Sequence, residues 1–359
     1  MSKLLTTRDY KNILIQESPV IDVRAPVEFV TGAFPGAVNL PLMFDEERKK
    51  IGICYKQQGR EAAIGLGYKI VSGENQKTKI QNWLQFIREH NQPVYLTCYR
   101  GGLRSQISHQ WIAENQAEVI RFEKGYKDYR QWSVSETQKY FLENRLLVLT
   151  GPTGSGKTDF LRAVKNYPTL DLEKLANHRG SAFGSMVRPQ PSQSDFENHI
   201  LKSILLSTAD SQIESTLRPL LVEDESRVIG SLHLTEELFQ NIRSQPVIFL
   251  ETDFESRVKN IFNEYITEAV RETQLDQLLD KYQQNIIKIS KRLGSQRALE
   301  IGGLLKNAQS ADFSEHCGWI ERLLSWYYDP LYNDSLQRRQ VQFQFKGNAQ
   351  AIQDFLLAK

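Results

Sequence analysis

A cysteine followed by two glycines and an arginine is the first place in the sequence where side chains could do chemistry. Cys98 follows the apolar run Val94–Thr97, and Arg104 lies six positions after it. A loop that turns at the glycines can direct its backbone N–H groups inward as an anion-binding nest, and a following helix adds its positive end. Because such surroundings favour a thiolate, the pattern predicts a nucleophilic Cys98 beside an oxyanion site. The predicted oxyanion loop comprises Arg100, Gly101, Gly102, Arg104 and Ser105.

A second glycine-rich turn, GPTGSGKT at positions 151–158, has the G-x4-G-K-T spacing of a P-loop. The glycines let backbone amides close around phosphate oxygens, the lysine neutralises charge, and the threonine can ligate a magnesium ion. The spacing predicts a diphosphate site but does not specify ATP, because the backbone recognises only the phosphates. The predicted diphosphate-binding residues are Gly151, Gly154, Ser155, Gly156, Lys157 and Thr158.

An acidic run, Glu223 to Glu225, closes the apolar segment Leu220–Val222. It is placed like the carboxylate that holds magnesium in P-loop folds, although acidic runs at strand ends are often only solvated. We therefore take Glu223 and Asp224 as candidates for a second site, with His178 and Arg179. No cofactor and no metal ligand follow firmly from the sequence, and Mg²⁺ is compatible with it.

Both loops need a strand before them and a helix after them, since ligands in open α/β sheets bind beyond the carboxyl ends of strands. Short apolar runs predict further strands at Leu220–Val222, Val247–Leu250 and Val341–Phe345. Apolar residues at helical spacing from Val258 to Val270 predict a long helix, which we interpret as core packing in a helical region at about 254–330. The polar stretch between the two loops predicts a domain junction near Gln138–Asn144.

The 359 residues suffice for two domains, and the net charge of +2 excludes a polyanion binder that works by bulk charge, but not a local basic groove. Three widely spaced cysteines, Cys54, Cys98 and Cys317, exclude a disulfide framework or a zinc cluster. Cys54 and Cys317 are expected to be structural, and a buried, unreactive Cys98 is the alternative to a nucleophile. Without an apolar run of about 18 residues or a signal core, we expect a cytoplasmic protein with no membrane partner.

The segment IDVRAPVEFVTGAFPGAVNLP, at positions 21–41, resembles the N-terminal signature of the rhodanese fold, and RFEKGYKDYRQW, at 121–132, resembles its end. The gap from Cys98 to Arg104 is one residue longer than in the usual sulfurtransferase loop and equals that of rhodanese-related phosphatases, so a larger transferred atom or group fits. The expected fold class is α/β: a rhodanese-like α/β domain at 1–138, then a P-loop NTPase-like α/β domain at 139–359 with the helical insertion. The matching positions are Asp22, Val23, Arg24, Glu28, Gly32, Pro35, Gly36, Ala37 and Pro41.

The combination of the two loops resembles the bacterial tRNA 2-selenouridine synthase family over essentially the full length. Five further segments carry the resemblance: CYKQQGREAAIGLGY (54–68), ANHRGSAFG (176–184), QPSQSDFE (190–197), VEDESRVIG (222–230) and SWYYDPLY (325–332). None of them follows from a generic rhodanese or kinase. Cys98, Arg104 and Lys157 show no departure that would suggest an inactive homologue.

This resemblance implies a transferase that acts on 2-thiouridine at wobble position U34 of the tRNAs for Lys, Glu and Gln. Geranyl diphosphate would first geranylate the sulfur, and selenium from selenophosphate would then replace the geranylthio group. The resemblance makes Cys98 an S-selanylcysteine carrier, with Arg100, Arg104 and the loop amides holding the phosphate. By hypothesis, the P-loop holds the diphosphate of geranyl diphosphate. We expect a monomer.

Candidate tRNA contacts are the basic and aromatic residues of the stretch 121–130 and the pair His178 and Arg179. Cations would meet phosphates while a ring stacks on an anticodon base. The alternative for the stretch, which we favour, is the closing helix of the rhodanese-like domain. The residues of the stretch are Arg121, Lys124, Tyr126, Lys127, Tyr129 and Arg130.

Two other functions fit the same loops. One is a rhodanese-type phosphatase or sulfurtransferase fused to a P-loop small-molecule kinase, which would release phosphate from aryl phosphates without tRNA. The other is a non-enzymatic tRNA-binding module with relic loops, against which the intact Cys98 and Lys157 argue.

Overall fold

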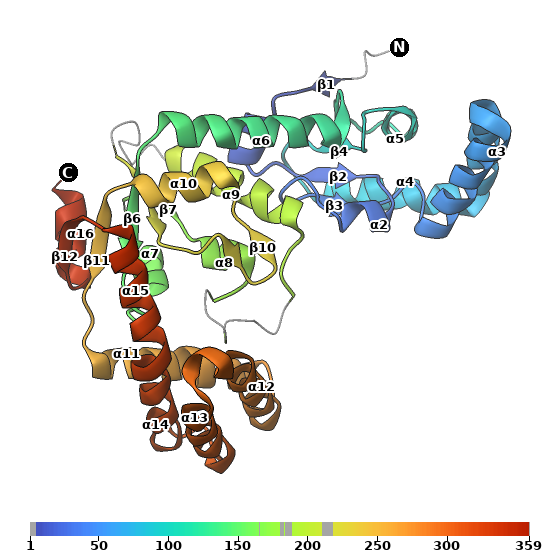
Figure 1. The fold of residues 1–359 in the computed structure, drawn as a ribbon. Helices are drawn as coiled ribbons and strands as arrows, with labels where there is room; N and C mark the ends of the chain where they lie inside the picture. Colours follow the sequence, from blue (N-terminus) through green and yellow to red (C-terminus); the bar gives the residue numbers. More distant parts are fainter. Residues whose placement is uncertain (1–4, 165, 180–182, 184–188, 210–217, 359) are drawn as a thin grey trace. The chain divides into compact units, whose positions relative to one another are not determined.

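The computed structural model describes residues 5–164, 166–179, 183, 189–209 and 218–358 (Figure 1). Contacts divide the chain into two compact units. The N-terminal unit is Met1–Tyr140 with Ser192–Ala209, and the C-terminal unit is Phe141–Pro191 with Asp210–Lys359. Within the described residues, no helix is both long and apolar enough to cross a membrane.

The N-terminal unit is built on a five-stranded sheet in the order β1-β5-β4-β2-β3, in which every paired neighbour is parallel. Its helices include α1 (Tyr10–Ile15), α2 (Pro26–Phe29), α4 (Gly73–Arg88) and α5 (Leu103–Glu114). Short, largely apolar strands with both faces covered are typical of a buried parallel sheet. The strands are β1 (Thr6–Thr7), β2 (Val20–Asp22), β3 (Val38–Asn39), β4 (Tyr95–Thr97) and β5 (Ile120–Phe122).

Helix α9 (Gln193–Ala209) belongs to the N-terminal unit, although the sequence places it within the predicted second domain. Leu201 and Leu205 join an aromatic core that includes Phe34 and Phe122. Asn198 is fully buried, and its side-chain amide donates hydrogen bonds to the carbonyl oxygen of Ala33 and to the hydroxyl of Tyr126. These buried polar bonds and apolar contacts make α9 a structural part of the N-terminal unit.

Helix α3 (Asp45–Ile70) is broken at Gly59, whose φ of 84° and ψ of −175° are not helical. The break makes two helical segments, which stand out from the sheet in Figure 1. Their apolar faces meet, because a side chain at Gly67 would contact the Cδ1 atom of Ile51 at 3.6 Å. This helical pair was not predicted from the sequence.

The C-terminal unit contains a second five-stranded sheet, in the order β12-β11-β6-β8-β7, again with parallel neighbours. The predicted strands at Leu220–Val222 and Val247–Leu250 are confirmed, and the last predicted strand begins two residues later than expected. Helices α7 (Lys157–Ala163), α8 (Leu172–Ala176), α10 (Glu236–Ser244) and α16 (Ala349–Leu357) and the hairpin β9 (Val228–Ile229) and β10 (Leu232–His233) complete it. The strands are β6 (Leu146–Thr150), β7 (Thr169–Leu170), β8 (Leu220–Glu223), β11 (Val247–Leu250) and β12 (Phe343–Gly347).

The helical region of this unit follows β11 (Figure 1). The predicted long helix is α11 (Phe254–Phe262) continued by a π-helical turn at Asn263–Thr267 and a 3-10 turn at Ala269–Arg271. Its predicted apolar face lies in or against one core cluster, so the interpretation as core packing is confirmed. The other helices are α12 (Leu275–Leu293), α13 (Ser295–Asn307), α14 (Phe313–Leu323) and α15 (Asp329–Arg339), with a second π-helical turn at Leu324–Tyr328 before α15.

Candidate active sites

The cysteine loop joins β4 to α5, as the sequence predicts. Cys98 is buried, and its thiol donates a hydrogen bond of 3.1 Å to Oγ of Ser105. That hydroxyl donates in turn to the carbonyl oxygen of Gly102, at 3.1 Å. Because Ser105 lies in the first turn of α5, the sulfur sits at the positive end of that helix, where a negative charge is stabilised. This placement supports a nucleophilic role for Cys98.

Two glycines let the cysteine loop fold tightly against the start of α6 (Gly125–Glu143). Gly101 has a φ of 64°, and a Cβ atom there would collide with the carbonyl group of Glu123. Gly125 has a φ of 69°, and a Cβ atom there would collide with the backbone of Cys98 and Gly101. The N–H of Tyr126 donates to the carbonyl oxygen of Cys98 at 2.8 Å, which fixes the loop. Gly125 was missed by the sequence reasoning, since its partner loop is distant in sequence.

Arg104 forms a two-point ion pair with Glu28, with nitrogen–oxygen distances of 2.5 and 3.0 Å. Arg48 approaches the same carboxylate at 3.1 Å. Burial alone would raise the pKa of Glu28, but the two guanidinium groups together hold it below its ordinary value. The Glu28 carboxylate thus orients Arg104. That Arg104 binds an oxyanion stays a prediction. Arg100 is exposed, and its guanidinium lies 5.7 Å from the ring centre of Tyr99.

The rhodanese signature residues near this loop are structural. Asp22 and Arg24 form a fully buried ion pair of 2.7 Å. Arg24 also donates to the carbonyl oxygen of Gly32 at 2.8 Å, and its guanidinium lies 4.2 Å from the ring centre of Tyr126. Burial raises the pKa of Asp22, and the bonds from Arg24 oppose that rise. The pair holds the loop after β2 and offers no group for chemistry.

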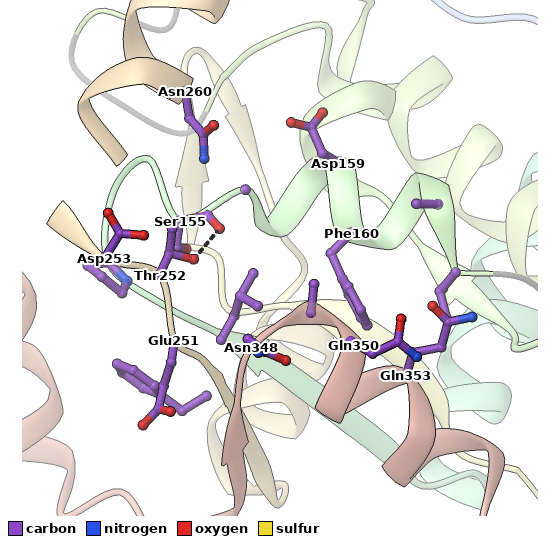
Figure 2. Close-up of a pocket in the computed structure, with 17 residues that line it drawn as sticks. Ser155, Asp159, Phe160, Glu251, Thr252, Asp253, Asn260, Asn348, Gln350 and Gln353 are labelled. Atoms are coloured by element: carbon purple, nitrogen blue, oxygen red, sulfur yellow. Dashed lines mark hydrogen bonds between the residues drawn. The ribbon is translucent and has the colours of Figure 1, made fainter. Parts of the chain in front are cut away.

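The P-loop joins β6 to α7. Side chains from outside the loop donate hydrogen bonds to its carbonyl oxygens. Arg257 donates to the carbonyl of Thr153 at 2.9 Å, and Asn260 donates to that of Gly154 at 2.9 Å. The hydroxyl of Thr252 donates to the carbonyl of Ser155 at 2.9 Å, a bond visible in Figure 2. The carbonyl groups are thereby turned outward, as an anion-binding loop requires.

The inner side of the P-loop presents donors. Among the described residues, no carbonyl oxygen accepts a hydrogen bond from the N–H of Gly154, Gly156 or Lys157. The ammonium group of Lys157 lies 2.8 Å from the carbonyl oxygen of Gly151. Gly154 and Gly156 both have a φ of 80°, which turns successive amides toward one side. The geometry fits a bound phosphate or diphosphate.

Three carboxylates gather beside the P-loop: Glu173, Glu223 and Glu225. Each offers an oxygen atom within 4.8 Å of the others, and the hydroxyl of Thr158 donates to Glu173 at 2.9 Å. One oxygen of Glu223, Oε2, is buried without a hydrogen-bond partner. Burial, followed by the neighbouring Glu173, raises the pKa of Glu225 to about 8 and that of Glu223 well above its ordinary value. Oxygen ligands of this kind suit a divalent cation such as Mg²⁺, which would relieve the repulsion.

Of the two predicted acidic candidates, the structure brings Glu223 but not Asp224 into this cluster. Successive residues at the end of a strand point to opposite faces, so Glu223 and Glu225 share a side and Asp224 does not. Asp224 accepts hydrogen bonds from Arg339 at 2.8 and 3.0 Å and from the hydroxyl of Thr150 at 2.8 Å. The sequence reasoning missed Glu173, because nothing in its local sequence marks it.

A cavity of about 930 Å³ opens beside the P-loop at the ends of β11 and β12 (Figure 2). Pro152, Ser155 and Gly156 contribute the P-loop side of its lining. Figure 2 shows amide side chains across the cavity from Asp159 and Asn260. The lining mixes apolar side chains with three carboxylates, Asp159, Glu251 and Asp253, so an anion entering the cavity needs the P-loop donors and a cation. The polar residues of the lining include Asp159, Glu251, Thr252, Asp253, Asn260, Asn348, Gln350 and Gln353.

Comparisons with known proteins cover both units. A family model described as "tRNA 2-selenouridine synthase AAA domain" matches residues 144–359, and one described as "Rhodanese-like domain" matches residues 6–131. A tRNA 2-selenouridine synthase of Nitrosomonas europaea is 43% identical, over 98% of this chain and 97% of its own. That of Bdellovibrio bacteriovorus is 40% identical over 96% of each chain, and that of a Sulfurovum species is 39% identical over 99% of each.

The chain belongs to the tRNA 2-selenouridine synthase family. The expected family and the expected α/β fold class, with a rhodanese-like domain before a P-loop domain, are confirmed. A crystal structure titled as the N-terminal domain of a putative ATP/GTP binding protein from Clostridium difficile 630 is 29% identical over 32% of this chain and 88% of its own, with a TM-score of 0.30. A likeness at that TM-score carries no structural argument.

One segment that carries the resemblance to this family, SWYYDPLY at 325–332, stabilises the P-loop. The carboxylate of Asp329, in SWYYDPLY, accepts hydrogen bonds of 2.5 and 3.1 Å from the guanidinium of Arg257. Arg257 in turn donates to the P-loop carbonyl of Thr153. The hydroxyl of Tyr332, in the same segment, lies 3.0 Å from that of Thr150 at the end of β6. The sequence pattern marked this segment without revealing its role, because the contacts span more than 70 residues.

Of the two remaining site candidates, Arg179 has partners of its own, whereas Nδ1 of His178 is buried without a hydrogen-bond partner. Arg179 pairs with Glu264 at 3.0 Å and lies over the ring of Tyr265. His178 is half-buried, and burial lowers its pKa, so the neutral imidazole is favoured. Both residues lie in a resemblance segment whose positions 180–182 and 184 fall outside the described residues.

The basic and aromatic stretch 121–130 is mainly structural, as the alternative interpretation predicted. Tyr126 and Tyr129 are buried in the core, so the expectation that they stack on a base is wrong. Arg121 donates to the carbonyl oxygen of Gly101, and Arg130 pairs with Glu197 on α9. Lys124 and Lys127 are exposed and remain candidates for phosphate contacts.

Proposed function

We propose that this chain converts 2-thiouridine to 2-selenouridine at the wobble position of tRNAs for Lys, Glu and Gln. The observation that carries the proposal is that both loops are built for anion chemistry in a chain matching tRNA 2-selenouridine synthases over 98% of its length. The rhodanese-like fold alone would fit many sulfur-transfer reactions. The P-loop of the C-terminal unit would add a reaction that consumes a diphosphate ester.

In the first step, the sulfur of 2-thiouridine attacks C1 of geranyl diphosphate. A carbon–sulfur bond forms, the C1–oxygen bond breaks, inorganic diphosphate leaves, and the base loses its N3 proton to solvent. The donors of the P-loop and Lys157 would bind the leaving diphosphate, whose charge grows as the bond breaks. The cluster of Glu173, Glu223 and Glu225 would hold a Mg²⁺ ion that neutralises part of that charge.

In the second step, selenium replaces the geranylthio group at C2 of the base. S-geranyl-2-thiouridine, selenophosphate and water give 2-selenouridine, geranylthiol and phosphate, so atoms and electrons balance overall. The carbon–sulfur bond at C2 breaks and a carbon–selenium bond forms. The Cys98 thiolate, stabilised by the N-terminus of α5, would attack C2 and expel geranylthiolate; hydrogen selenide, which water releases from selenophosphate together with phosphate, would then attack C2 and release Cys98. The S-selanylcysteine that the resemblance implies stays a prediction and is not a step of this redox-neutral sequence, because its outer selenium lies two electrons above selenide.

Arg104 would serve the second step through its pair with Glu28. A selenophosphate anion is a stronger partner for a guanidinium than a single carboxylate, so binding can recruit Arg104 in part from Glu28. Arg100, which is exposed at the same loop, would add a second cation. We propose that the protein acts as a cytoplasmic monomer.

The test is incubation of the protein with 2-thiouridine tRNA, geranyl diphosphate and selenophosphate, with each omitted in turn. Nucleoside mass spectrometry should show S-geranyl-2-thiouridine without selenophosphate and 2-selenouridine only with all components. No mass change on thiolated tRNA under any condition would overturn the proposal. Phosphate release from an aryl phosphate without tRNA would instead favour the phosphatase alternative.

A further inference from the structure

A polar cavity of about 510 Å³ lies in the C-terminal unit, between the last turns of α10 and α15 and the first residues of β11 and β12. Strand β12 is the edge of the sheet (Figure 1). Its pairing with β11 shifts register between Val247 and Ile248, so Gln344 is an extra residue in β12, and it lines the cavity. Such bulges are frequent at sheet edges beside binding sites, where they redirect a side chain. The edge strand is therefore distorted where the cavity opens.

The charge of this cavity is positive. Its charged lining residues are Arg243, at the end of α10, and Arg339, at the end of α15, and no acidic side chain among the described residues lines it. A third cation lies close by, because the ammonium group of Lys346 is 4.1 Å from the ring centre of Phe343, which lines the cavity. The cavity beside the P-loop, in contrast, carries three carboxylates. The other polar side chains of the lining are Ser244, Gln245, Gln340, Gln342 and Gln344.

Arg243 has a half-buried guanidinium group that lacks an acceptor. Its side chain is 24% exposed, and Nε is buried without a hydrogen-bond partner. Oδ1 of Asp224 lies 3.7 Å from Nη1, which is too far for a hydrogen bond. The guanidinium lies 4.8 Å from the ring centre of Phe239, a contact that positions it without using its N–H groups. Because hydrogen bonds left unmade by a buried charged group are costly, these donors point to an acceptor that binds here.

One carboxylate serves both arginines. Asp224 accepts two hydrogen bonds, of 2.8 and 3.0 Å, from the single nitrogen Nη1 of Arg339, and Nε of Arg339 is buried without a partner. Burial lowers the pKa of Arg243; the charge of Asp224 opposes this fall, and the charge of Arg339 adds to it. Two guanidinium groups thus share one negative charge. An anion in the cavity would neutralise the excess positive charge.

The donors and the volume of the cavity suit a phosphate with its sugar. A guanidinium group presents pairs of N–H groups whose geometry matches two oxygens of a phosphate. Glutamine amides and a serine hydroxyl are among the groups that bind phosphate and sugar oxygens of nucleic acids. Pockets for small molecules measure roughly 300–1,000 Å³, so this cavity has room for a nucleotide unit.

The position of the cavity favours a large ligand. The cavity lies at the first residues of β11 and β12, whereas the P-loop follows the last residue of β6. Since these strands are parallel, the two sites lie at opposite ends of the sheet. The four residues of β11, at about 3.3 Å each, separate those ends by about 10 Å. A polynucleotide has phosphates all along its backbone and can occupy such a site while its reacting base is bound elsewhere.

We infer that this cavity binds a phosphate of the tRNA backbone through Arg243 and Arg339, away from the base that reacts. The inference rests on the proposed function, which supplies the identity of the polynucleotide. The phosphate accepts hydrogen bonds from the open donors of Arg243 and shares Arg339 with Asp224. Free phosphate and mononucleotides offer the same chemistry, and the test separates these sources from tRNA.

The experiment measures the Kd of thiolated tRNA for the full chain over a series of salt concentrations, without geranyl diphosphate or selenophosphate. Arg243→Gln should raise Kd about 5- to 30-fold and reduce the slope of log Kd against log salt concentration by about 0.7–0.9, as expected for one lost phosphate contact. Arg243→Lys keeps the charge, so it should keep the slope and lose less affinity. The melting temperature of Arg243→Gln should not fall, because this arginine makes no hydrogen bond among the described residues.

The matched control is Arg338→Gln, which removes the same charge from the neighbouring residue of α15. Arg338 is 81% exposed, pairs with Asp334 and does not line the cavity. This variant should keep Kd within about twofold of wild type and keep the salt slope. Equal changes in Arg243→Gln and Arg338→Gln would assign the effect to general surface charge and overturn the inference. Weaker binding at an unchanged slope, with a lower melting temperature, would also overturn it, because that result indicates a structural arginine.

Inorganic phosphate and uridine monophosphate are titrated into the same proteins by calorimetry. If Arg243→Gln abolishes binding of either one but leaves the Kd and salt slope for tRNA unchanged, the cavity binds a small phosphate ligand and the inference is wrong. A wild-type protein that binds thiolated tRNA, with the expected loss in Arg243→Gln, but modifies none of it when all substrates are present would contradict the proposed function alone.

Discussion

The cysteine loop and the P-loop share a backbone arrangement that suits anion binding, but different side chains surround them. Each follows a parallel strand, turns at glycines with positive φ and ends at the N-terminus of a helix. The P-loop, however, opens on an acidic, amide-rich cavity of about 930 Å³, whereas an apolar cavity of about 300 Å³ lies behind the cysteine loop. Backbone geometry gives both loops an affinity for anions, and the side chains around them decide which anion is used and what it carries.

From this difference in surroundings, we assign geranylation to the P-loop and selenation to the cysteine loop. A diphosphate is small, highly charged and best held by amides, a lysine and a cation, all of which surround the P-loop. A geranylated base is largely apolar and needs a nucleophile beside an apolar wall, which only the cysteine loop offers among the described residues. Four predictions test this division.

The largest effect is expected from Cys98→Ala. Removing the sulfur should lower selenation of pre-geranylated tRNA by at least about a thousandfold, the order of loss seen when an essential nucleophile is removed. Geranylation of 2-thiouridine tRNA should stay within about twofold of wild type. Nucleoside mass spectrometry reads both products, and loss of geranylation as well would count against separate sites.

Lys157→Ala should give the opposite pattern with a somewhat smaller effect. Without the ammonium group, the departing diphosphate loses one charge partner, and geranylation should fall by about 100- to 1,000-fold. Selenation of pre-geranylated tRNA should be nearly unchanged, since that substrate carries no diphosphate. A variant that geranylates at the wild-type rate would show that the P-loop serves another ligand.

Gly101→Ala should destabilise the N-terminal unit, because the new methyl group meets the backbone of Glu123 at a positive φ. We expect a loss of about 2–4 kcal/mol in the free energy of unfolding, measured by chemical denaturation. Gly59→Ala is the control, since its φ is also positive but no atom lies within 4 Å of the added Cβ, and it should cost about 1 kcal/mol. Equal losses would mean that the cysteine loop is less tightly packed than its contacts indicate.

The smallest effect concerns pH and the carboxylates beside the P-loop. Burial and the nearby Glu173 raise the pKa of Glu225 to about 8 from an ordinary 4.5, so the folded protein holds a proton that the unfolded chain releases. This contribution to stability is complete below pH 4.5 and is lost as pH rises toward 8. In buffer that contains a metal chelator, the melting temperature of the wild-type protein should therefore fall by a few degrees between pH 6 and 9.

Glu225→Gln is the matched variant for this measurement. The amide keeps the shape of the side chain but cannot lose a proton, so the fall in melting temperature between pH 6 and 9 should be smaller than in wild type. An identical pH profile in the two proteins would place the titrating group elsewhere.

Much of the fold was predictable because its signals are local. The strands at Leu220–Val222 and Val247–Leu250, the two glycine turns and the apolar face from Val258 to Val270 each depend on neighbouring residues, and the structure has them all. The π-helical turn at Asn263–Thr267 was not predictable, since an apolar stripe at helical spacing suits an α-helix equally well.

What the sequence could not reveal depends on partners far along the chain. Glu28 and Arg104 are 76 positions apart, and no local pattern shows that the arginine is held by a carboxylate. Helix α9 buries Phe196, Ile200, Leu201, Ile204 and Leu205, but its sequence does not show which sheet these side chains cover. The apolar cavity forms only when α3 folds back at Gly59, and a glycine within a helical segment does not announce a break.

The most direct test of the division between the loops is a hand-over of tRNA between two variants. Thiolated tRNA is incubated with Cys98→Ala and geranyl diphosphate, purified, and then given to Lys157→Ala with selenophosphate. If each loop carries its own step, nucleoside mass spectrometry will find 2-selenouridine after the second incubation, although neither variant makes it alone from thiolated tRNA. The absence of 2-selenouridine from the handed-over tRNA, with wild-type protein converting the same sample, would contradict the account.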